Sequence, residues 1–512
     1  MSGWPEARCF GDVWADTVAA RRDSPFLRFE GPSGDVREWS YAEFDDLVAR
    51  MAACLVAHGV EHGSAVHLAL TNSPAFVAAW IAAARLGAWI VPSDPLGRAP
   101  ELAGHIARTR PAVGLYARAR VGEYLAASDE MPVIGFDEAD TELAQLTRDR
   151  FTEWPQLDLF DRAAVMFTSG TTGRPKGVEI TQANYAFAGK VMAEAACLRP
   201  EHRQLVVLPL FHANAQYYSF ASAIWAGASV ALMHTFSASG FLTQAARHEA
   251  THASLFAAPI RMILARGATP VEGVRLRHCW YAMNVSNDQY EVLTTLLGCR
   301  PRQLYGMTET IPAVLTDEAA SPRPSSMGYV TAGCILEVHD VDGSVTTDGE
   351  VGEIVVGGER GLTLFAGYLD DPETTAASFD RSWFRTGDRA RRDAAGRHYF
   401  DGRRADILKV AGENVSTVEV EQVLAAHPGL LEAAVVGMPD DVRDEVPVAF
   451  VVAADPAQPP TLDDLTRWCA ERLTKAKQPR QISFVDELPR TSVGKIRKFL
   501  LKDPTAEKGA MR

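Results

Sequence analysis

Residues 166–177 read MFTSGTTGRPKG and bring glycines, hydroxyl side chains and a lysine together in one short segment. Glycine lets backbone N–H groups turn toward an anion because no Cβ stands in the way. Hydroxyl groups and an ammonium group complete an oxyanion cradle. Gly, Ser and Thr also dominate plain surface turns, but the ending Pro-Lys-Gly favours a loop that binds the phosphates of a nucleoside triphosphate.

The segment differs from a Walker A motif. Arg174 and Pro175 separate Gly173 from Lys176, whereas the Walker pattern places Gly-Lys-Ser/Thr at the start of a helix. The apolar residues 163–168 and 178–180 predict a strand on each side, and Thr181 resembles the N-cap of a helix over 182–198. We therefore expect the loop to join two strands.

Composition limits the class of protein. A chain of 512 residues is too long for one core, so two or more domains are expected. The formal charge of −14 argues against a nucleic-acid partner. Seven scattered cysteines without a C-x-x-C pair are typical of a reducing, cytoplasmic protein without a zinc site. The apolar run 75–91 contains Arg85 and predicts a buried helix followed by a strand, not a membrane span.

Helix and strand patterns alternate along the first half of the chain. Ser40 is expected to begin the first of these helices. The expected helices are 41–58, 75–86, 100–109 and 120–127, and the expected strands are 66–70, 88–91, 113–116, 132–136, 206–208, 229–232 and 254–256. This alternation predicts an α/β fold with a largely parallel sheet.

The pattern changes after about residue 328. Strand-like segments at 336–341 and 353–356, with Asp-Gly turns between them, predict a small, mainly β subdomain. From residue 417 a helix, two strands and a second helix predict a small α+β unit. The polar, Arg-rich stretch 402–406 is the expected linker.

Five further segments add to the loop: LPLFH (208–212), YGMTET (305–310), WFRTGD (383–388), GRRADILKVAGENVSTVEVE (402–421) and PRTSVGKIRK (489–498). In this order and spacing, the set resembles the adenylate-forming superfamily of acyl-CoA synthetases, adenylation domains and luciferases. The run from GENVS through VEVEQVLAAHPGLLEAAVVGMPDDVRDE, together with YGMTETI, is most similar to crotonobetaine/carnitine-type CoA ligases.

The resemblance implies a fold and a reaction. It implies a large N-terminal domain of layered α/β sheets over 1–402, with a mainly β subdomain at 328–402. A hinge at 403–406 would lead to a small mobile α+β domain over 407–512. Many members carry Asp or Lys at the hinge position that Ala405 occupies here, and Asp406 follows it. The implied substrates and cofactors are a carboxylic acid, ATP, Mg²⁺ and CoA, with acyl-AMP and pyrophosphate formed first.

The resemblance also assigns roles in nucleotide binding. The β- and γ-phosphates would be cradled by Thr168, Ser169, Gly170, Thr171, Thr172, Gly173 and Lys176. Tyr305 would stack on adenine and Gln303 would bond its edge, with Gly306 in the same motif. Thr308 would contact the α-phosphate, and Glu309 would hold Mg²⁺, which prefers one or two carboxylates plus phosphate oxygens.

A second group of residues follows from the later motifs. Asp388 would bond the ribose hydroxyls with help from Arg403, although an isolated Thr-Gly-Asp more often caps a turn. Lys495 would bridge the carboxylate oxygen and the α-phosphate, a role that suits a compact charge on a flexible stem. Gly412 lies in the loop that a second conformation would bring toward the pantetheine tunnel.

The acid pocket is expected to involve His212, Asn214, Gln216, Tyr217, Tyr218 and Asn284. His212 resembles the family's aromatic or histidine gate and is the fourth catalytic candidate beside Thr308, Glu309 and Lys495. These polar and aromatic residues favour a functionalised or ring-bearing acid over a plain long chain. They include no carboxylate that would pair with a quaternary ammonium group, although aromatic faces attract such cations.

Other interpretations stay open from the residues alone. The acyl group could be loaded onto a carrier protein, or the chemistry could serve another oxyacid or amine. A nucleotide-binding scaffold without turnover is less favoured, because the polar residues of the motifs are intact. A phosphoryl-transfer ATPase would release ADP, whereas an adenylating enzyme releases AMP. No pattern in the chain indicates an oligomeric state.

Overall fold

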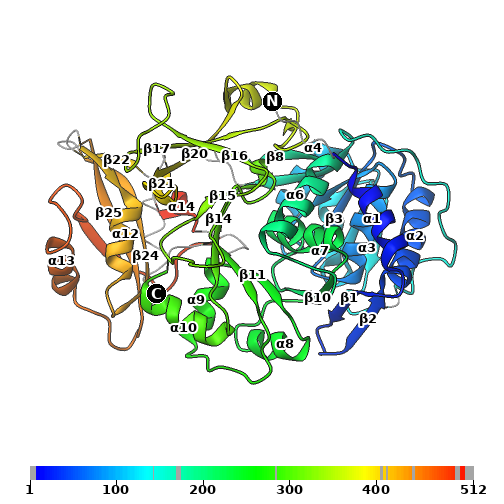
Figure 1. Ribbon diagram of the computed structural model, residues 1–512, viewed down its shortest axis with the longest axis horizontal. Coiled ribbons are helices and arrows are strands. Elements are labelled where there is room, and N and C mark those ends of the chain that lie inside the picture. Colours follow the sequence, from blue (N-terminus) through cyan, green and yellow to red (C-terminus); the bar gives the residue numbers. More distant parts are fainter. Residues whose placement is uncertain are drawn as a thin grey trace. The chain divides into compact units, whose positions relative to one another are not determined.

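The computed structural model describes residues 7–141, 143–168, 175–282, 285–403, 407–410, 413–440, 444–490 and 496–501 (Figure 1). The chain forms two compact units. One comprises residues 1–324, 328–336 and 356–384, and the other comprises 325–327, 337–355 and 385–512. The predicted division at 403–406 stays a prediction.

The first large sheet has, within the described residues, the strand order β15-β14-β13-β12-β11-β9-β10-β1-β2. Its strands are β1 (Pro25–Glu30), β2 (Val36–Ser40), β9 (Arg203–Val206), β10 (Ser229–Met233), β11 (His252–Phe256), β12 (His278–Ala282), β13 (Arg302–Tyr305), β14 (Leu315–Thr316) and β15 (Tyr329–Val330). The run from β13 to β1 is parallel, and β2, β14 and β15 are antiparallel to their neighbours.

The second large sheet has the order β18-β8-β7-β4-β3-β5-β6. Its strands are β3 (Ala65–Ala69), β4 (Trp89–Pro92), β5 (Val113–Ala117), β6 (Val133–Phe136), β7 (Arg162–Thr168), β8 (Lys176–Thr181) and β18 (Gly367–Tyr368). The strands from β7 to β6 are parallel, whereas β8 and β18 continue the sheet in antiparallel pairs. The predicted α/β fold with a largely parallel sheet is confirmed, although β9 begins and ends earlier than the predicted strand 206–208.

Helices cover the sheets of this unit. They are α1 (Phe10–Arg21), α2 (Tyr41–Ala57), α3 (Pro74–Arg85), α4 (Ala99–Thr109), α5 (Val121–Ser128), α6 (Gln182–Ala195), α7 (Ser222–Ala226), α8 (Phe241–Arg247), α9 (Ala257–Ala265), α10 (Asn287–Leu297) and α11 (Pro372–Ala377), with the one-turn η1 (Arg118–Arg120). Helix α3 is buried over nearly its whole length, as expected for a helix that is apolar on all sides. Trp80 on α3 packs against Phe10 of α1 and Tyr185 of α6, with ring centroids 5.3 Å apart in both pairs.

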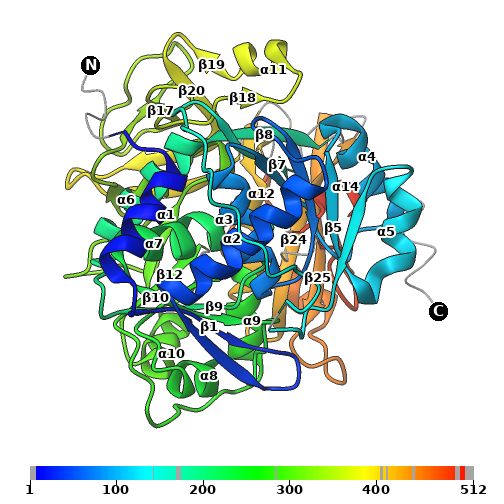
Figure 2. The same ribbon diagram turned by 90° about the vertical axis from the view of Figure 1, so that its right-hand side faces the viewer.

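Helices α4 and α5 lie together beside β5 (Figure 2). Apolar residues of both helices pack with Ala69 of β3 and Tyr116 of β5 in one hydrophobic cluster. This packing matters for the functional site because α4 ends close to the strands that flank the Gly-rich loop, as described below.

The remaining strands form two smaller sheets. One has the order β16-β17-β20-β19 with β21 beside β20, and the other has the order β23-β22-β25-β24 with β26 beside β25. Their bounds are β16 (Ile335–His339), β17 (Val351–Gly357), β19 (Phe379–Asp380), β20 (Trp383–Arg392), β21 (His398–Arg403), β22 (Ile407–Val410), β23 (Glu413–Ser416), β24 (Leu430–Asp440), β25 (Asp444–Ala453) and β26 (Gln481–Phe484). Helices α12 (Thr417–Ala425), α13 (Leu462–Ala470) and α14 (Lys498–Leu501) complete the predicted small α+β part.

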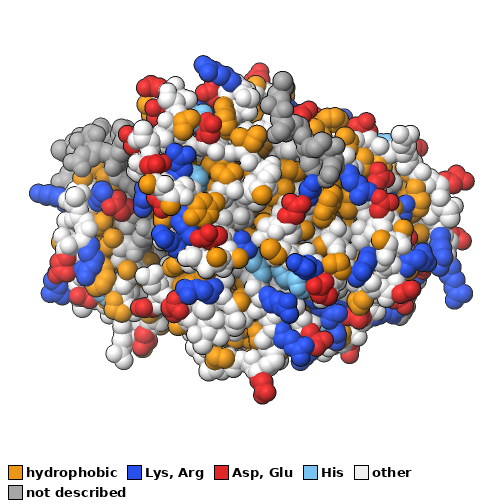
Figure 3. All heavy atoms as spheres, in the orientation of Figure 1, with side chains coloured by type: hydrophobic (Ala, Val, Ile, Leu, Met, Phe, Trp, Pro, Cys, Tyr) orange, Lys and Arg blue, Asp and Glu red, His pale blue; other side chains and the backbone are white. Residues whose placement is uncertain are grey.

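The surface carries charged side chains of both signs. Acidic and basic side chains are interspersed over the face seen in Figure 3. Among the described residues, no helix has the length and apolar character needed to cross a bilayer.

A buried chain of hydrogen bonds links α4 and α5 to the second sheet. His67 on β3 contacts the Tyr124 hydroxyl through Nδ1 (2.7 Å) and the Ser93 hydroxyl through Nε2 (2.9 Å). Ser93 Oγ also contacts Nδ1 of His105 on α4 at 2.8 Å. Burial, with a smaller contribution from the nearby His105, lowers the pKa of His67 to about 3, so His67 is neutral in the folded protein.

This neutral histidine predicts acid sensitivity. Above pH ~6.5 His67 is neutral in both states, but below that pH the unfolded chain binds a proton that the folded protein does not. Each pH unit between ~6.5 and the folded pKa then removes about 1.4 kcal/mol of stability. We expect the His67→Gln variant to melt below wild type at pH 7 and the gap between them to narrow as the pH falls to 5. The exposed His58, changed to Gln, is the control; a gap for His67→Gln that is constant with pH would contradict the role of His67.

Candidate active site

The Gly-rich loop joins two strands, as predicted, and the structure shows that these strands are antiparallel. Thr168 at the end of β7 is the register partner of Lys176 at the start of β8. The Thr168 hydroxyl lies 3.5 Å from the Lys176 carbonyl oxygen, so the strand pairing extends to both ends of the loop. The predicted phosphate-binding residues Ser169, Gly170, Thr171, Thr172 and Gly173 lie outside the described residues.

Lys176 and Glu309 both contact the side chain of Tyr368. The Lys176 ammonium lies 4.6 Å from the centre of the Tyr368 ring, which permits a cation–π contact. The Tyr368 hydroxyl donates a hydrogen bond of 3.1 Å to Oε1 of Glu309, whose side chain is buried. Burial and then the Glu309 charge raise the pKa of Tyr368, so its hydroxyl stays protonated and remains a donor. The backbone N–H of Phe365 also donates to the Glu309 carbonyl oxygen.

Sequence reasoning missed Tyr368. It lies outside every motif, and it reaches the site because β18 pairs with β8, where Tyr368 is opposite Val178. Aromatic residues in a short strand carry no signal for such a contact unless the strand pairing is known.

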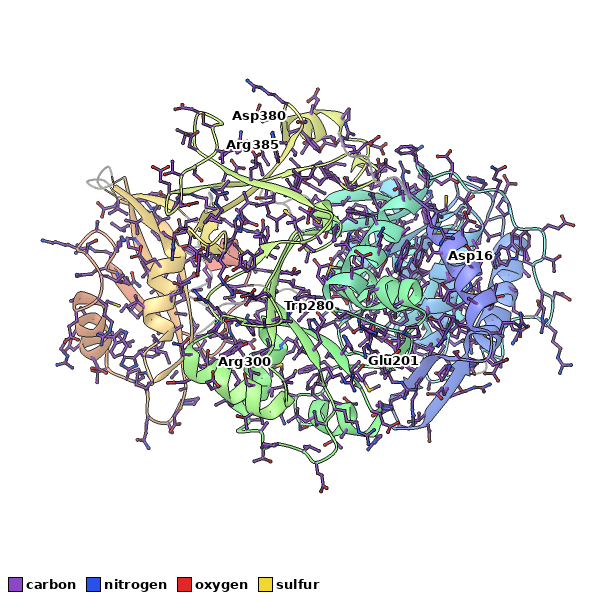
Figure 4. The ribbon with its side chains drawn as sticks, viewed as in Figure 1. Asp16, Glu201, Trp280, Arg300, Asp380 and Arg385 are labelled. Carbon is purple, nitrogen blue, oxygen red and sulfur yellow. The ribbon has the colours of Figure 1, made fainter. Side chains whose placement is uncertain are left out.

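The YGMTET segment begins at the end of β13. Arg302, the first residue of β13, anchors this strand with hydrogen bonds to the carbonyl oxygens of Asp317 (2.7 Å) and Ala195 (3.0 Å). Its guanidinium group lies 4.7 Å from the ring centre of Trp280 on β12, which is labelled in Figure 4. Gln303 is buried on the same strand and Tyr305, its last residue, is partly exposed. These anchors fix the position from which the motif leaves the sheet.

Thr308 and Glu309 lie in the single turn η3 (Thr308–Thr310). The Thr310 hydroxyl accepts a hydrogen bond from the Met307 backbone N–H and donates to its carbonyl group, both at 3.0 Å. The next residue, Ile311, is fully buried and has a φ of 70°. A β-branched residue in this left-handed region is strained and persists only where its surroundings hold it.

Most of the candidate acid-binding residues lie on a π-helix, η2 (Asn214–Ala221). His212 precedes it and is partly exposed, with its ring 4.2 Å from that of Phe211. Gln216 is fully buried: it accepts a hydrogen bond from the Tyr185 hydroxyl and donates one of 2.6 Å to the Leu210 carbonyl. The Gln216 amide therefore ties the π-helix to its surroundings. Asn284 lies outside the described residues.

Two oxygen atoms of the π-helix lack a partner. The Tyr217 hydroxyl and the Asn214 side-chain oxygen are buried without a hydrogen bond to any part of the chain that the structure describes. Burial raises the pKa of Tyr217, and the charges that add to this rise include Glu309. Tyr217 therefore lies near the carboxylate of the YGMTET segment.

Asp388 and Arg403 are brought together in the second unit. They are register partners on β20 and β21, and Arg403 Nε donates a hydrogen bond of 2.8 Å to Asp388 Oδ1. Asp388 is only 3% exposed, so its carboxylate lies inside a strand pair and does not simply cap a turn. Ala405, Gly412 and Lys495 lie outside the described residues.

The chain matches two parts of one known family. Residues 14–369 match the AMP-binding enzyme family, and residues 419–495 match the AMP-binding enzyme C-terminal domain. Because the first match spans more than half of the chain, this protein belongs to the AMP-binding enzyme family. The predicted resemblance to adenylate-forming enzymes is confirmed.

Named relatives and solved structures show which members of this family the chain resembles. A crotonobetaine/carnitine–CoA ligase of Salmonella arizonae (strain ATCC BAA-731 / CDC346-86 / RSK2980) is 32% identical, over 96% of this chain and 98% of that protein. An o-succinylbenzoate coenzyme A synthetase of Bacillus subtilis, solved with AMP, superposes with a TM-score of 0.84 at 28% identity and covers 96% of this chain and 98% of that one. The ATP-bound MatB of Rhodopseudomonas palustris gives a TM-score of 0.86 at 25% identity, over 97% and 99% of the two chains.

These comparisons confirm the enzyme class that was predicted from the motifs. The protein is an AMP-forming acyl-CoA synthetase, and its fold is that of adenylate-forming enzymes with a large N-terminal and a smaller C-terminal domain. ATP and CoA are substrates that the enzymes of this class have in common.

Close packing around Gly306 predicts a cost for any side chain there. A Cβ at this position would lie 2.9 Å from Ala313 Cα, from the Pro312 carbonyl oxygen and from the Tyr218 hydroxyl. We expect Gly306→Ala to lower the free energy of unfolding by about 1–3 kcal/mol, because backbone atoms must shift. Gly104 in α4 has nothing within 4 Å of an added Cβ, so Gly104→Ala is the matched control and should be neutral or slightly stabilising. Equal melting temperatures for both variants, measured by calorimetry, would contradict the crowding at Gly306.

Proposed function

We propose that this enzyme couples a carboxylic acid to CoA in two half-reactions. In the first, a carboxylate oxygen attacks the α-phosphorus of ATP and the bond to the leaving pyrophosphate breaks. In the second, the sulfur of CoA attacks the acyl carbon, the bond to the AMP oxygen breaks and the thiol proton is released. Adenylation is needed because a carboxylate is a poor electrophile, and the protein must hold two anions together while charge develops.

The observation that carries this proposal is the contact of Lys176 and Glu309 with the same tyrosine. It supports the proposal because a cation suited to the β- and γ-phosphates and a carboxylate suited to a metal ion are held by one rigid ring. Mg²⁺ typically keeps several waters and binds one or two carboxylates plus phosphate oxygens. Glu309 would share such an ion with the phosphates of the nucleotide. Such an ion would neutralise phosphate charge.

The other nucleotide contacts follow the family pattern. Thr308 binds the α-phosphate and Tyr305 stacks on adenine, with Gln303 at its edge. Asp388 accepts hydrogen bonds from the ribose hydroxyls while Arg403 orients its carboxylate. Lys495 stabilises the charge on the attacking and phosphoryl oxygens.

The unpartnered oxygens of η2 indicate what kind of acid is bound. A buried polar atom without a partner costs about 1–3 kcal/mol, and a polar group of a substrate removes that cost. Asn214 Oδ1 accepts a hydrogen bond, and the Tyr217 hydroxyl both donates and accepts. We therefore propose that the acid carries a hydroxyl or amino substituent. The relatives named as crotonobetaine/carnitine–CoA ligases add betaine-type acids to the panel that should be tested.

Carboxylate-dependent ATP–pyrophosphate exchange tests the first half-reaction. We expect exchange with one class from a panel of fatty, aromatic, hydroxylated and betaine-type acids, and release of AMP as the nucleotide product once CoA is added. Lys495→Ala should lower the exchange rate about 100-fold or more, because one preorganised charge at the reacting oxygens is lost. The exposed Arg497, changed to Ala, is the matched control.

The alternatives give different results in the same assay. Release of ADP would indicate phosphoryl transfer, and exchange without thioester formation from CoA would favour a carrier protein or another acceptor. ATP binding without exchange for any acid would favour a scaffold. Exchange by Lys495→Ala at the wild-type rate would contradict the role given to this lysine.

Tyr217→Phe tests the acid side. The variant removes one hydroxyl while keeping the ring. The kcat/KM for an acid that carries a hydroxyl or amino substituent should therefore fall about tenfold, the size of one lost hydrogen bond. The KM for ATP should not change. An unsubstituted acid of the same size serves as the control, and an equal loss for both acids would contradict specific recognition by Tyr217.

A further inference from the structure

Arg108, in the last turn of α4, touches the chain on both sides of the phosphate loop. Its Nη1 donates a hydrogen bond of 2.6 Å to the carbonyl oxygen of Pro175, which precedes Lys176. Its guanidinium carbon lies 4.8 Å from the ring centre of Phe167, which precedes Thr168. One side chain therefore connects the two strands at the points where the loop leaves and rejoins the sheet.

The Phe167 ring is held by α4 at a second point. His105, one helical turn before Arg108, stacks on Phe167 with ring centroids 4.0 Å apart and planes 1° from parallel. Residues three apart on a helix share a face, so His105 and Arg108 form one platform against this ring. His105 is itself held by Ser93, which belongs to the buried hydrogen-bond chain that reaches Tyr124.

Arg108 also contributes charge where the loop begins and ends. Asp371, the N-cap of α11, has a pKa lowered first by its hydrogen bonds with Thr374, and the positive charges of Lys176 and Arg108 add to this effect. Both cations therefore lie within electrostatic reach of the same carboxylate. Burial and then the Arg108 charge lower the pKa of His105 to about 4, so the platform adds no competing proton at neutral pH.

We propose that Arg108 is a positioning residue for the phosphate loop. Through its contacts with Phe167 and Pro175 it fixes the separation and direction of the strand ends from which the loop starts and to which it returns. Arginine suits this role because its planar guanidinium stacks on a ring and donates to a carbonyl group at the same time, which an ammonium does not. The inference rests on the proposed function, because it takes the loop to be the phosphate-binding loop.

The role predicts a selective defect in nucleotide binding. The loop contacts the pyrophosphate portion of ATP, which AMP lacks. Arg108→Gln in the full-length protein should therefore weaken binding of ATP and of inorganic pyrophosphate about tenfold, while AMP affinity stays at the wild-type value. Isothermal titration with each of the three ligands measures this without turnover.

Two further variants separate positioning from charge. Arg110, the exposed residue that follows α4, loses the same charge in Arg110→Gln and should bind all three ligands like wild type. Arg108→Lys keeps the charge but loses the planar stack, so it should show most of the defect of Arg108→Gln. Melting temperatures confirm that each variant is folded.

Several results would overturn the inference. The first is wild-type pyrophosphate affinity in Arg108→Gln, and the second is a loss of AMP affinity in that variant as large as its loss of ATP affinity. The third is wild-type affinity for all three ligands in Arg108→Lys, which would leave only a long-range charge effect. Failure of the proposed function gives a different result: the wild-type enzyme would show no acid-dependent pyrophosphate exchange, whereas the binding comparison would still decide the role of Arg108.

Discussion

The antiparallel pairing of β7 with β8 is the constraint on which the candidate active site depends. It closes the Gly-rich loop between Thr168 and Lys176, and it makes β8 available for pairing with β18 on its other side. That second pairing carries Tyr368 to Lys176 and Glu309. Backbone hydrogen bonds of one sheet thus bring Lys176 and Tyr368 together, and the Tyr368 hydroxyl reaches Glu309 from there.

Local sequence signals were sufficient for much of the framework. Ser40 and Thr181 begin the predicted helices, and each forms a capping box with the residue three positions later. The strands on both sides of the loop and the α/β alternation were also predicted correctly. These features depend on contacts between near neighbours in sequence or on simple periodicity, so residue types and spacing are enough to reveal them.

Contacts between distant residues were not predictable in this way. Tyr368 is 59 positions from Glu309, and Arg108 is 67 positions from Pro175. Neither Tyr368 nor Arg108 lies within a sequence motif. The π-helix after His212 was missed as well, because its sequence has no pattern that separates it from an α-helix. π-Helical turns are rare and occur frequently at functional sites. Here the turn carries two oxygens that have no hydrogen-bond partner in the part of the chain that the structure describes.

The strained turn after the YGMTET segment has a consequence for protein engineering. Ile311 holds a left-handed backbone inside the core, a conformation that costs on the order of 1–3 kcal/mol and is offset by the packing around it. Selection for thermal stability alone would favour sequences that relax this residue, and the relaxed chain would no longer hold Thr308 and Glu309 in the same orientation. If Thr308 and Glu309 have the roles proposed above, heat resistance and catalytic competence are in competition at this one position.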